Sequence, residues 1–233
     1  MSESSDKVSS LSSLPIFPLP LVLLPNEILP LHIFEPRYRQ MLSDIVPSGN
    51  FFGITRFEPS EAFVQRPDEG TVGCVAEIRD AEDLGDGRTN IVVNGIIRYN
   101  LSSYLDSGTE YLYAKVEFFE DDVSPAENLQ PLADSVFSVF ERIAKAAFKI
   151  SGSRGKFPEI PPTDPEKLSF LVTAAFNLEN DLKYELLVMT STAQRLRRLN
   201  AILLQSVGQM EESANIHEVS QTNGHSKKKI DLD

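Results

Sequence analysis

The stretch Leu29-Pro30-Leu31-His32-Ile33-Phe34-Glu35-Pro36-Arg37-Tyr38-Arg39-Gln40-Met41 decides how the first half of this 233-residue chain is interpreted. Its prolines favour extended segments before Phe34, whereas Pro36 suits an early helical position. One apolar helix face is then formed by Tyr38, Met41, Leu42 and Ile45. The sequence therefore predicts extended segments joined by turns, followed by a short helix that stops at residues 47–49.

The composition is that of an average globular protein, with 41% hydrophobic and 24% charged residues. A chain of this size buries roughly 70% of its unfolded surface, so it needs no metal or disulfide to stabilise a core. Cys74 is the single cysteine, which excludes an intramolecular disulfide. This fits a reducing compartment, and we expect a cytoplasmic protein.

Two classes of partner are disfavoured by composition. The apolar segment 14–34 contains five prolines, each of which removes a helix hydrogen bond, so a membrane-spanning helix is not expected there. The net charge of −12 repels phosphate backbones and anionic membranes. Arg195, Arg197, Arg198 and the lysines at 227–229 are more simply read as a solvated helix face and a polar tail. We therefore expect neither nucleic acid nor membrane as a partner.

Short strands dominate the segment from residue 50 to residue 119. Alternation is clearest where Val72, Cys74, Ala76 and Ile78 share one face, which makes Cys74 a core residue rather than a nucleophile. Residues 85–87 predict a turn, and Asn94-Gly95 indicates either a hairpin or a bulge. Extended segments are predicted at 91–93 and 97–101 on either side of Asn94-Gly95, and a further strand is predicted at 111–119. This set of short strands suggests a barrel.

Helices follow. Ser124, Pro125 and Glu127 have the spacing of a capping box before a long helix that ends near Ile150. Further helices are predicted after Asp164-Pro165, over 182–189 and after Ser191. The predicted fold class is α+β: a flexible leader at 1–13, a strand-rich barrel at 14–122, a helical part at 123–210 and a disordered polar tail at 211–233.

The run from Leu14 to Leu19, Leu24-Pro25 and the opening stretch together resemble the start of the Lon protease (peptidase S16) N-terminal, substrate-binding domain, especially its stand-alone members. Val93-Asn94-Gly95 through Arg98-Tyr99 is similar to the family's V-x-G-x-x-R-F strand, and residues 168–203 resemble its helical end. The resemblance implies a PUA-like antiparallel β-barrel followed by a C-terminal helical bundle, and a role in recognising polypeptide substrates.

The catalytic modules of full-length Lon proteases have no counterpart among the motifs. Residues 152–156 have the wrong spacing for a phosphate-binding loop, and the glycine-flanked serine of a Ser-Lys dyad does not appear. A zinc site of the usual kind cannot be assembled from His32, His217, His225 and Cys74. We therefore expect a protein that is not an enzyme and has no cofactor or metal.

One dense polar cluster remains as a candidate peptide-binding site, made of His32, Phe34, Glu35, Arg37, Tyr38 and Arg39. In the structural interpretation, Glu35 helps to cap a helix, Tyr38 packs in the core, and the arginines hold neighbouring carbonyls or carboxylates. In the functional interpretation, His32 and both arginines border a groove that accepts exposed peptide segments.

Three hypotheses for function follow. The leading one is a non-catalytic module that recognises unfolded or degron-bearing polypeptides, as an adaptor in protein quality control that works with a separate protease or ATPase. The alternative is an RNA-binding PUA-like protein, which the net charge opposes. An enzyme acting through Cys74 or His32 is the least favoured, because no set of base, nucleophile and orienting group can be assembled.

Overall fold

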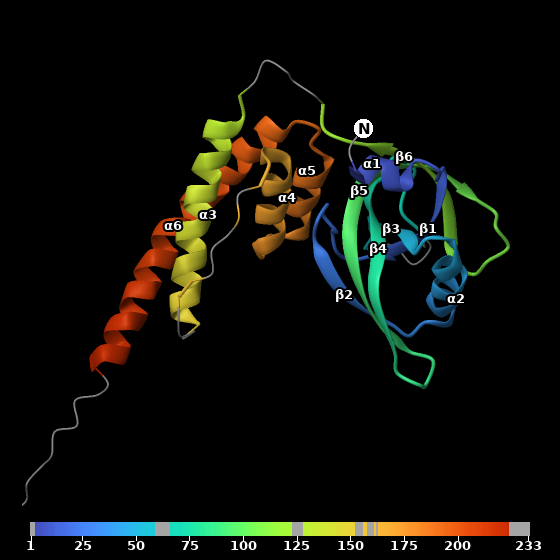
Figure 1. Ribbon diagram of the computed structural model, residues 1–233, viewed down its shortest axis with the longest axis horizontal. Helices are drawn as coiled ribbons and strands as arrows, with labels where there is room; N and C mark the ends of the chain where they lie inside the picture. The colour runs from blue at the N-terminus through green and yellow to red at the C-terminus, as the bar shows by residue number, and fades with distance from the viewer. Residues whose placement is uncertain are drawn as a thin grey trace, which may run out of the picture. The chain divides into compact units, whose positions relative to one another are not determined.

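The computed structural model describes residues 3–58, 66–122, 128–151, 156–157, 161 and 163–223 (Figure 1). The elements are, in chain order, α1 (Glu3–Val8), β1 (Ser13–Leu19), β2 (Ile28–Ile33), α2 (Pro36–Ile45), the 3₁₀ helix η1 (Val46–Ser48), β3 (Phe51–Arg56), β4 (Val72–Asp83), β5 (Thr89–Leu105), β6 (Leu112–Phe119), α3 (Gln130–Ile150), α4 (Pro165–Ala175), α5 (Asn180–Val188) and α6 (Thr192–Asn223). The predicted mixed α+β class is confirmed.

The chain divides into two compact units. The first contains Met1–Ser124 and Phe170–Ser191, and the second contains Pro125–Ser169 and Thr192–Asp233. Residues 170–191 belong with the strands because Phe170 and Leu187 pack with Val22, Leu24 and Val72 in one buried cluster. The division therefore falls within helix α4, whose residues 165–169 belong to the second unit and whose residues 170–175 belong to the first.

The strands of the first unit form one sheet with the order β2-β5-β4-β3-β1-β6, and β5 also pairs with β6. Strands β1 and β3 run parallel, and the other pairs are antiparallel. Strand β5 has 17 residues, so its first part pairs with β2 and its last part with β6. Strand β2 is bonded only to β5 among the described strands, which makes it an edge strand.

The predicted apolar face of α2 is confirmed. Its buried residues are Tyr38, Met41, Leu42 and Ile45. They join Phe17, Phe52 and the inward side chains of β4 and β5 in a hydrophobic core. The Tyr38 ring lies 4.1 Å from the Phe17 ring, centroid to centroid. Helix α2 is thus held against the sheet by apolar packing.

The turn at residues 85–87 is confirmed as the β4–β5 hairpin, where Gly85 and Gly87 have φ of 79° and 82°. Of the two alternatives at Asn94-Gly95, the hairpin is wrong, because both residues lie inside β5. The bulge is confirmed, because the pairing with β4 shifts register directly after these residues. Gly95 is required for another reason. A Cβ there would collide with the Leu24 carbonyl oxygen, and the Gly95 N–H donates to Glu27 O at 2.9 Å.

The two ends of the chain carry more helix than the sequence predicts. Residues 3–8 form α1, and Val8 is buried with Leu14 and Ile16, which anchors a segment that the sequence suggests is flexible. Helix α6 extends to Asn223, beyond the expected end near residue 210. The capping residues 124–127 predicted for α3 and the glycine loop 152–155 lie outside the described residues.

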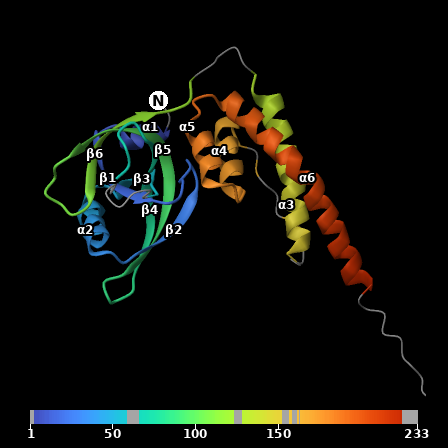
Figure 2. The same ribbon diagram turned by 180° about the vertical axis from the view of Figure 1, so that it is seen from behind.

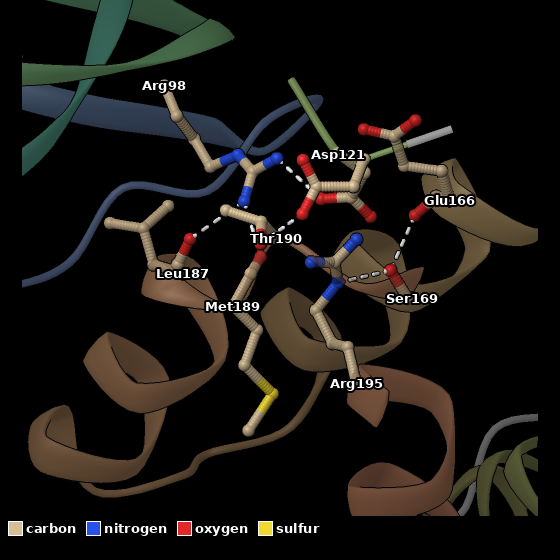
Figure 3. Close-up of polar contacts among 9 residues, drawn as sticks. Arg98, Asp121, Glu166, Ser169, Leu187, Met189, Thr190 and Arg195 are labelled. Carbon is tan, nitrogen blue, oxygen red and sulfur yellow. Dashed lines mark hydrogen bonds and ion pairs between the residues drawn. The ribbon is translucent and has the colours of Figure 1, made fainter. Parts of the chain in front are cut away.

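In the second unit, α3 and α6 lie side by side (Figures 1 and 2). The buried face of α3 consists of small and branched residues: Ala133, Val136, Val139, Ile143 and Ala146. A bidentate pair joins the two helices, in which Arg142 Nε and Nη2 each donate to Glu211 at 2.9 Å. In the same unit Arg195 is fully buried and donates to Ser169 Oγ at 2.7 Å, while Ser169 donates to Glu166 O (Figure 3).

A second buried arginine, Arg98 of β5, organises the first unit (Figure 3). Its Nη1 donates to the carbonyl oxygens of Leu187 at 3.1 Å and Met189 at 2.6 Å. These two carbonyl groups lie at the C-terminal end of helix α5. Its Nη2 donates to Asp121. The guanidinium also lies over the rings of Phe119 and Phe170. Arg98 therefore ties α4 and α5 to the sheet.

Candidate functional site

The exposed side chains of β2 and Phe34 form a ridge, defined here as the β2 ridge: Ile28, Pro30, His32 and Phe34. Alternation along the strand turns these residues outward, whereas Ile33 points into the core. Ile28 is 70% exposed and Phe34 is 58% exposed, so two large apolar side chains lie on the same exposed row. The ridge thus presents apolar area to solvent along the sheet edge.

His32 is fixed at the centre of the ridge. Its Nδ1 lies 2.8 Å from Asn90 Oδ1. The imidazole and the Phe34 ring are stacked, with centroids 6.0 Å apart and planes inclined by 28°. The Asn90 amide in turn donates to Glu82 Oε2 at 3.4 Å. Histidine and phenylalanine therefore form one exposed platform that is supported from β5.

The other four predicted site residues separate into different environments. The Glu35 carboxylate binds Arg37 at 2.8 Å and makes no side-chain cap, whereas the Glu35 carbonyl accepts the N–H groups of Tyr38 and Arg39. Tyr38 is buried, burial raises its pKa, and the Arg37 guanidinium covers its ring at 4.5 Å. The exposed Arg39 guanidinium lies against Gly87. The packing of Tyr38 and the pairing of Arg37 with a carboxylate agree with the structural interpretation, whereas the side-chain cap expected from Glu35 does not form.

The β2 ridge continues into a three-stranded face, defined here as the outer face. Strand register aligns Pro30 with Val92 and Asp80, and it aligns His32 with Asn90 and Glu82. A bulge at Arg79 brings Asp80 onto this face. These six residues, together with Leu31 and Ile91, line a hollow of ≈ 380 Å³.

The outer face has an uneven distribution of charge. Asp80 and Glu82 are exposed, and neither makes an ion pair within the described part of the chain. Glu77, further along β4, is neutralised by Arg79 at 3.0 Å and Lys7 at 3.6 Å. The face therefore combines an apolar column on β2, a polar column on β5 and two acidic groups on β4.

A second hollow of ≈ 360 Å³ is lined by Arg56, Glu58, Arg66, Asp68 and Tyr184, among others. Its central arginine is already neutralised, because Arg56 binds Asp181 at 2.6 Å and Glu58 at 3.5 Å. The Tyr184 hydroxyl accepts the Val72 N–H at 3.1 Å. These contacts stabilise the fold and leave little for a ligand.

Nothing in the described residues suggests a reactive centre. Cys74 is fully buried, and burial raises the pKa of its thiol, so it is poorly suited to be a nucleophile. No group of three or more potential metal-binding side chains occurs in the described ranges. None of the described helices is long and apolar enough to cross a membrane.

Comparison with solved structures gives the class of fold. The crystal structure of a Lon N-terminal domain protein from Xanthomonas campestris aligns with a TM-score of 0.58 and 21% identity, covering 82% of this chain and 98% of that one. The N-terminal domain of the Mycobacterium avium complex Lon protease gives 0.57 and 19%, covering 82% and 97%. The fold is that of Lon N-terminal domains.

Sequence comparison then gives the family. Residues 13–205 match the ATP-dependent protease La (LON) substrate-binding domain, and the chain belongs to this family. The Lon protease of Escherichia coli K12 is 27% identical over 199 residues, which is 82% of this chain and 24% of that protein. That of Azospirillum brasilense is 23% identical over 203 residues. The chain spans about a quarter of the length of these relatives, and the matched part is the substrate-binding domain, not the protease or ATPase domains.

Several residues of the outer face were missed by sequence reasoning. Ile28 could have been identified from the sequence, because a period of two places it on one face of a strand with Pro30 and His32. Asp80 and Glu82 could not be assigned, because the bulge at Arg79 changes which side chains of β4 point outward. Asn90 could not be assigned either, because its position beside His32 depends on the register between β2 and β5.

Proposed function

We propose that this chain is a non-catalytic recognition module that binds exposed apolar segments of polypeptides through the β2 ridge. The observation that carries the proposal is the exposure of Ile28 and Phe34, at 70% and 58%, beside a hollow in a domain of the Lon substrate-binding family. Large apolar side chains held rigidly at a surface are typical of protein-binding sites.

The candidate residues would have different roles in this function. Phe34 and His32 would contact the polypeptide directly, because their stacked rings are exposed. Tyr38 would act only as a support, since it is buried against Phe17. Glu35 and Arg37 would hold the turn that presents Phe34, through their ion pair. Arg39 would border the site next to the β4–β5 hairpin, where its guanidinium lies against Gly87.

We further propose that the bound polypeptide is passed to a separate protease or ATPase, so that the chain acts as an adaptor in protein quality control. The family membership supports this role.

We also propose that strands β5, β4, β3, β1 and β6 form the small PUA-like barrel, and that helices α3 and α6 form the start of a helical bundle. RNA binding is disfavoured, because Asp80 and Glu82 would repel a phosphate backbone on this face.

The test is binding of a permanently unfolded protein, reduced and carboxymethylated α-lactalbumin, measured by biolayer interferometry. Phe34→Ser removes apolar area that the complex would bury, so we expect its affinity to fall roughly fivefold or more. Val46→Ser is the matched control, because Val46 is 57% exposed but lies on η1, away from the ridge.

The control should bind as the wild type does. Equal losses for Phe34→Ser and Val46→Ser would contradict the assignment of the site. Absence of binding by the wild-type chain would contradict the function itself. Circular dichroism of each variant establishes that it is folded.

A further inference from the structure

We propose that the outer face selects polypeptide segments in which a lysine or arginine lies two positions from an apolar residue. This inference rests on the proposed function and names the class of segment that the site binds. The apolar residue would lie on the β2 ridge beside Phe34 and Pro30. The basic residue would lie on β4, between Asp80 and Glu82.

The spacing follows from the register of the three strands. Pro30, Val92 and Asp80 lie in one row, and His32, Asn90 and Glu82 lie in the next. Neighbouring strands are separated by about 4.8 Å, so the columns on β2 and β4 are about 10 Å apart. An extended peptide rises about 3.3 Å per residue and its side chains alternate between two faces, so an apolar and a basic residue that both face the sheet can lie two positions, about 6.6 Å, apart. The long side chain of lysine or arginine covers the remaining distance to the β4 column.

The charge preference follows from what surrounds each carboxylate. Glu77 is neutralised by Arg79 and Lys7. Asp80 accepts the Ala81 N–H and Glu82 accepts the Asn90 amide, but neither has a cationic neighbour among the ion pairs of the described residues. A lysine or arginine between them would complete two charge pairs, whereas a glutamate would meet two like charges. The hollow between β2 and β4, of ≈ 380 Å³, has room for such a side chain.

The test uses three synthetic peptides of identical length that carry Leu-Phe and, two residues after the Phe, a Lys, a Gln or a Glu. Dissociation constants are obtained by NMR titration of the full chain, which measures weak affinities. We expect the Lys peptide to bind roughly fivefold more tightly than the Gln peptide at low salt, as for two partly screened ion pairs. The Glu peptide should bind most weakly.

The decisive variant is Asp80→Asn with Glu82→Gln, which keeps the hydrogen-bonding oxygen of each side chain and removes both charges. It should bind the Lys and Gln peptides equally. The matched control is Glu69→Gln with Glu110→Gln, which removes two charges from exposed residues in the loops before β4 and β6. This control should keep the preference for lysine.

The inference is overturned if the Asp80 and Glu82 variant keeps the preference, or if both double variants lose it equally, which would indicate an effect of net charge alone. Failure of the proposed function gives a different pattern: no peptide binds, or Phe34→Ser leaves every affinity unchanged. Peptides that bind equally well and depend on Phe34 would sustain the proposed function and overturn only the charge selection.

Discussion

Arg98 Nη2 lies 2.5 Å from Asp121 Oδ1, and the two side chains are only 1% and 6% exposed. The same guanidinium donates to the last carbonyl groups of α5. A buried charge pair of this kind stabilises only while both partners remain, because the desolvation of each ion is offset by the other. The relationship therefore joins the C-terminal end of α5 to strand β5 through one buried side chain.

Arg98→Met should lower the free energy of unfolding by about 3–5 kcal/mol, because it breaks the buried ion pair with Asp121 and removes the hydrogen bonds to the carbonyl groups of Leu187 and Met189. Urea denaturation measures this value. The double variant Arg98→Met with Asp121→Leu should be less destabilised than Arg98→Met alone, since it removes both charges of the buried pair together. Arg37→Met is the surface control, and its exposed pair with Glu35 should contribute less than about 1 kcal/mol. A double variant as unstable as the single one would show that the charge pair is not the cause.

Gly95→Ala should destabilise the chain by about 1–3 kcal/mol, the usual result of overpacking, since its Cβ would meet the backbone of Leu24 rather than a side chain that can move. Gly208→Ala provides the comparison, because Gly208 lies inside α6 with open space around it. That change should stabilise by about 0.5–1 kcal/mol through helix propensity. Thermal melts of both variants check the prediction, and a neutral Gly95→Ala would contradict the close approach.

Cys74 should resist alkylation in the native state, because it is fully buried and burial raises its thiol pKa. Iodoacetamide labelling followed by mass spectrometry should show modification only at urea concentrations that unfold the chain. Rapid labelling of the native protein at neutral pH would contradict this and would reopen the possibility of a reactive thiol.

Stability should decrease at alkaline pH partly through Tyr111. Burial and the hydrogen bond to Asp44 raise the pKa of Tyr111 to about 12. A group with a raised pKa in the folded state contributes its full stability below its unfolded pKa of about 10 and loses it as the pH rises toward its folded pKa. Tyr111→Phe should be about 1 kcal/mol less stable than wild type at pH 8, through loss of the hydrogen bond. That difference should shrink above pH 10 in urea titrations, and a constant difference would contradict the assignment.

The sequence predicted those features that depend on local periodicity. The apolar face of α2, the hairpin at 85–87, the start of α4 at Pro165 and the burial of Cys74 all follow from spacing along the chain, and each is confirmed. The family resemblance, carried by the stretch around Pro30-Leu31-His32, is also confirmed.

Features that depend on long-range register were not predictable. Asn94-Gly95 has the local signature of a hairpin, but the Leu24 loop packs on Gly95 and the strand continues. The exposed position of Phe34 depends on where α2 meets the sheet. The pairing of His32 with Asn90 joins residues that are 58 positions apart, and no single segment of sequence contains that information.

Photo-crosslinking tests the central claim most directly. An unfolded polypeptide carrying a benzophenone group beside an apolar residue would be bound to the full chain, irradiated and mapped by mass spectrometry. The account predicts that crosslinks concentrate on residues 28–34 and on neighbouring positions of β4 and β5. Crosslinks concentrated on α3 or α6, with none on residues 28–34, would contradict it.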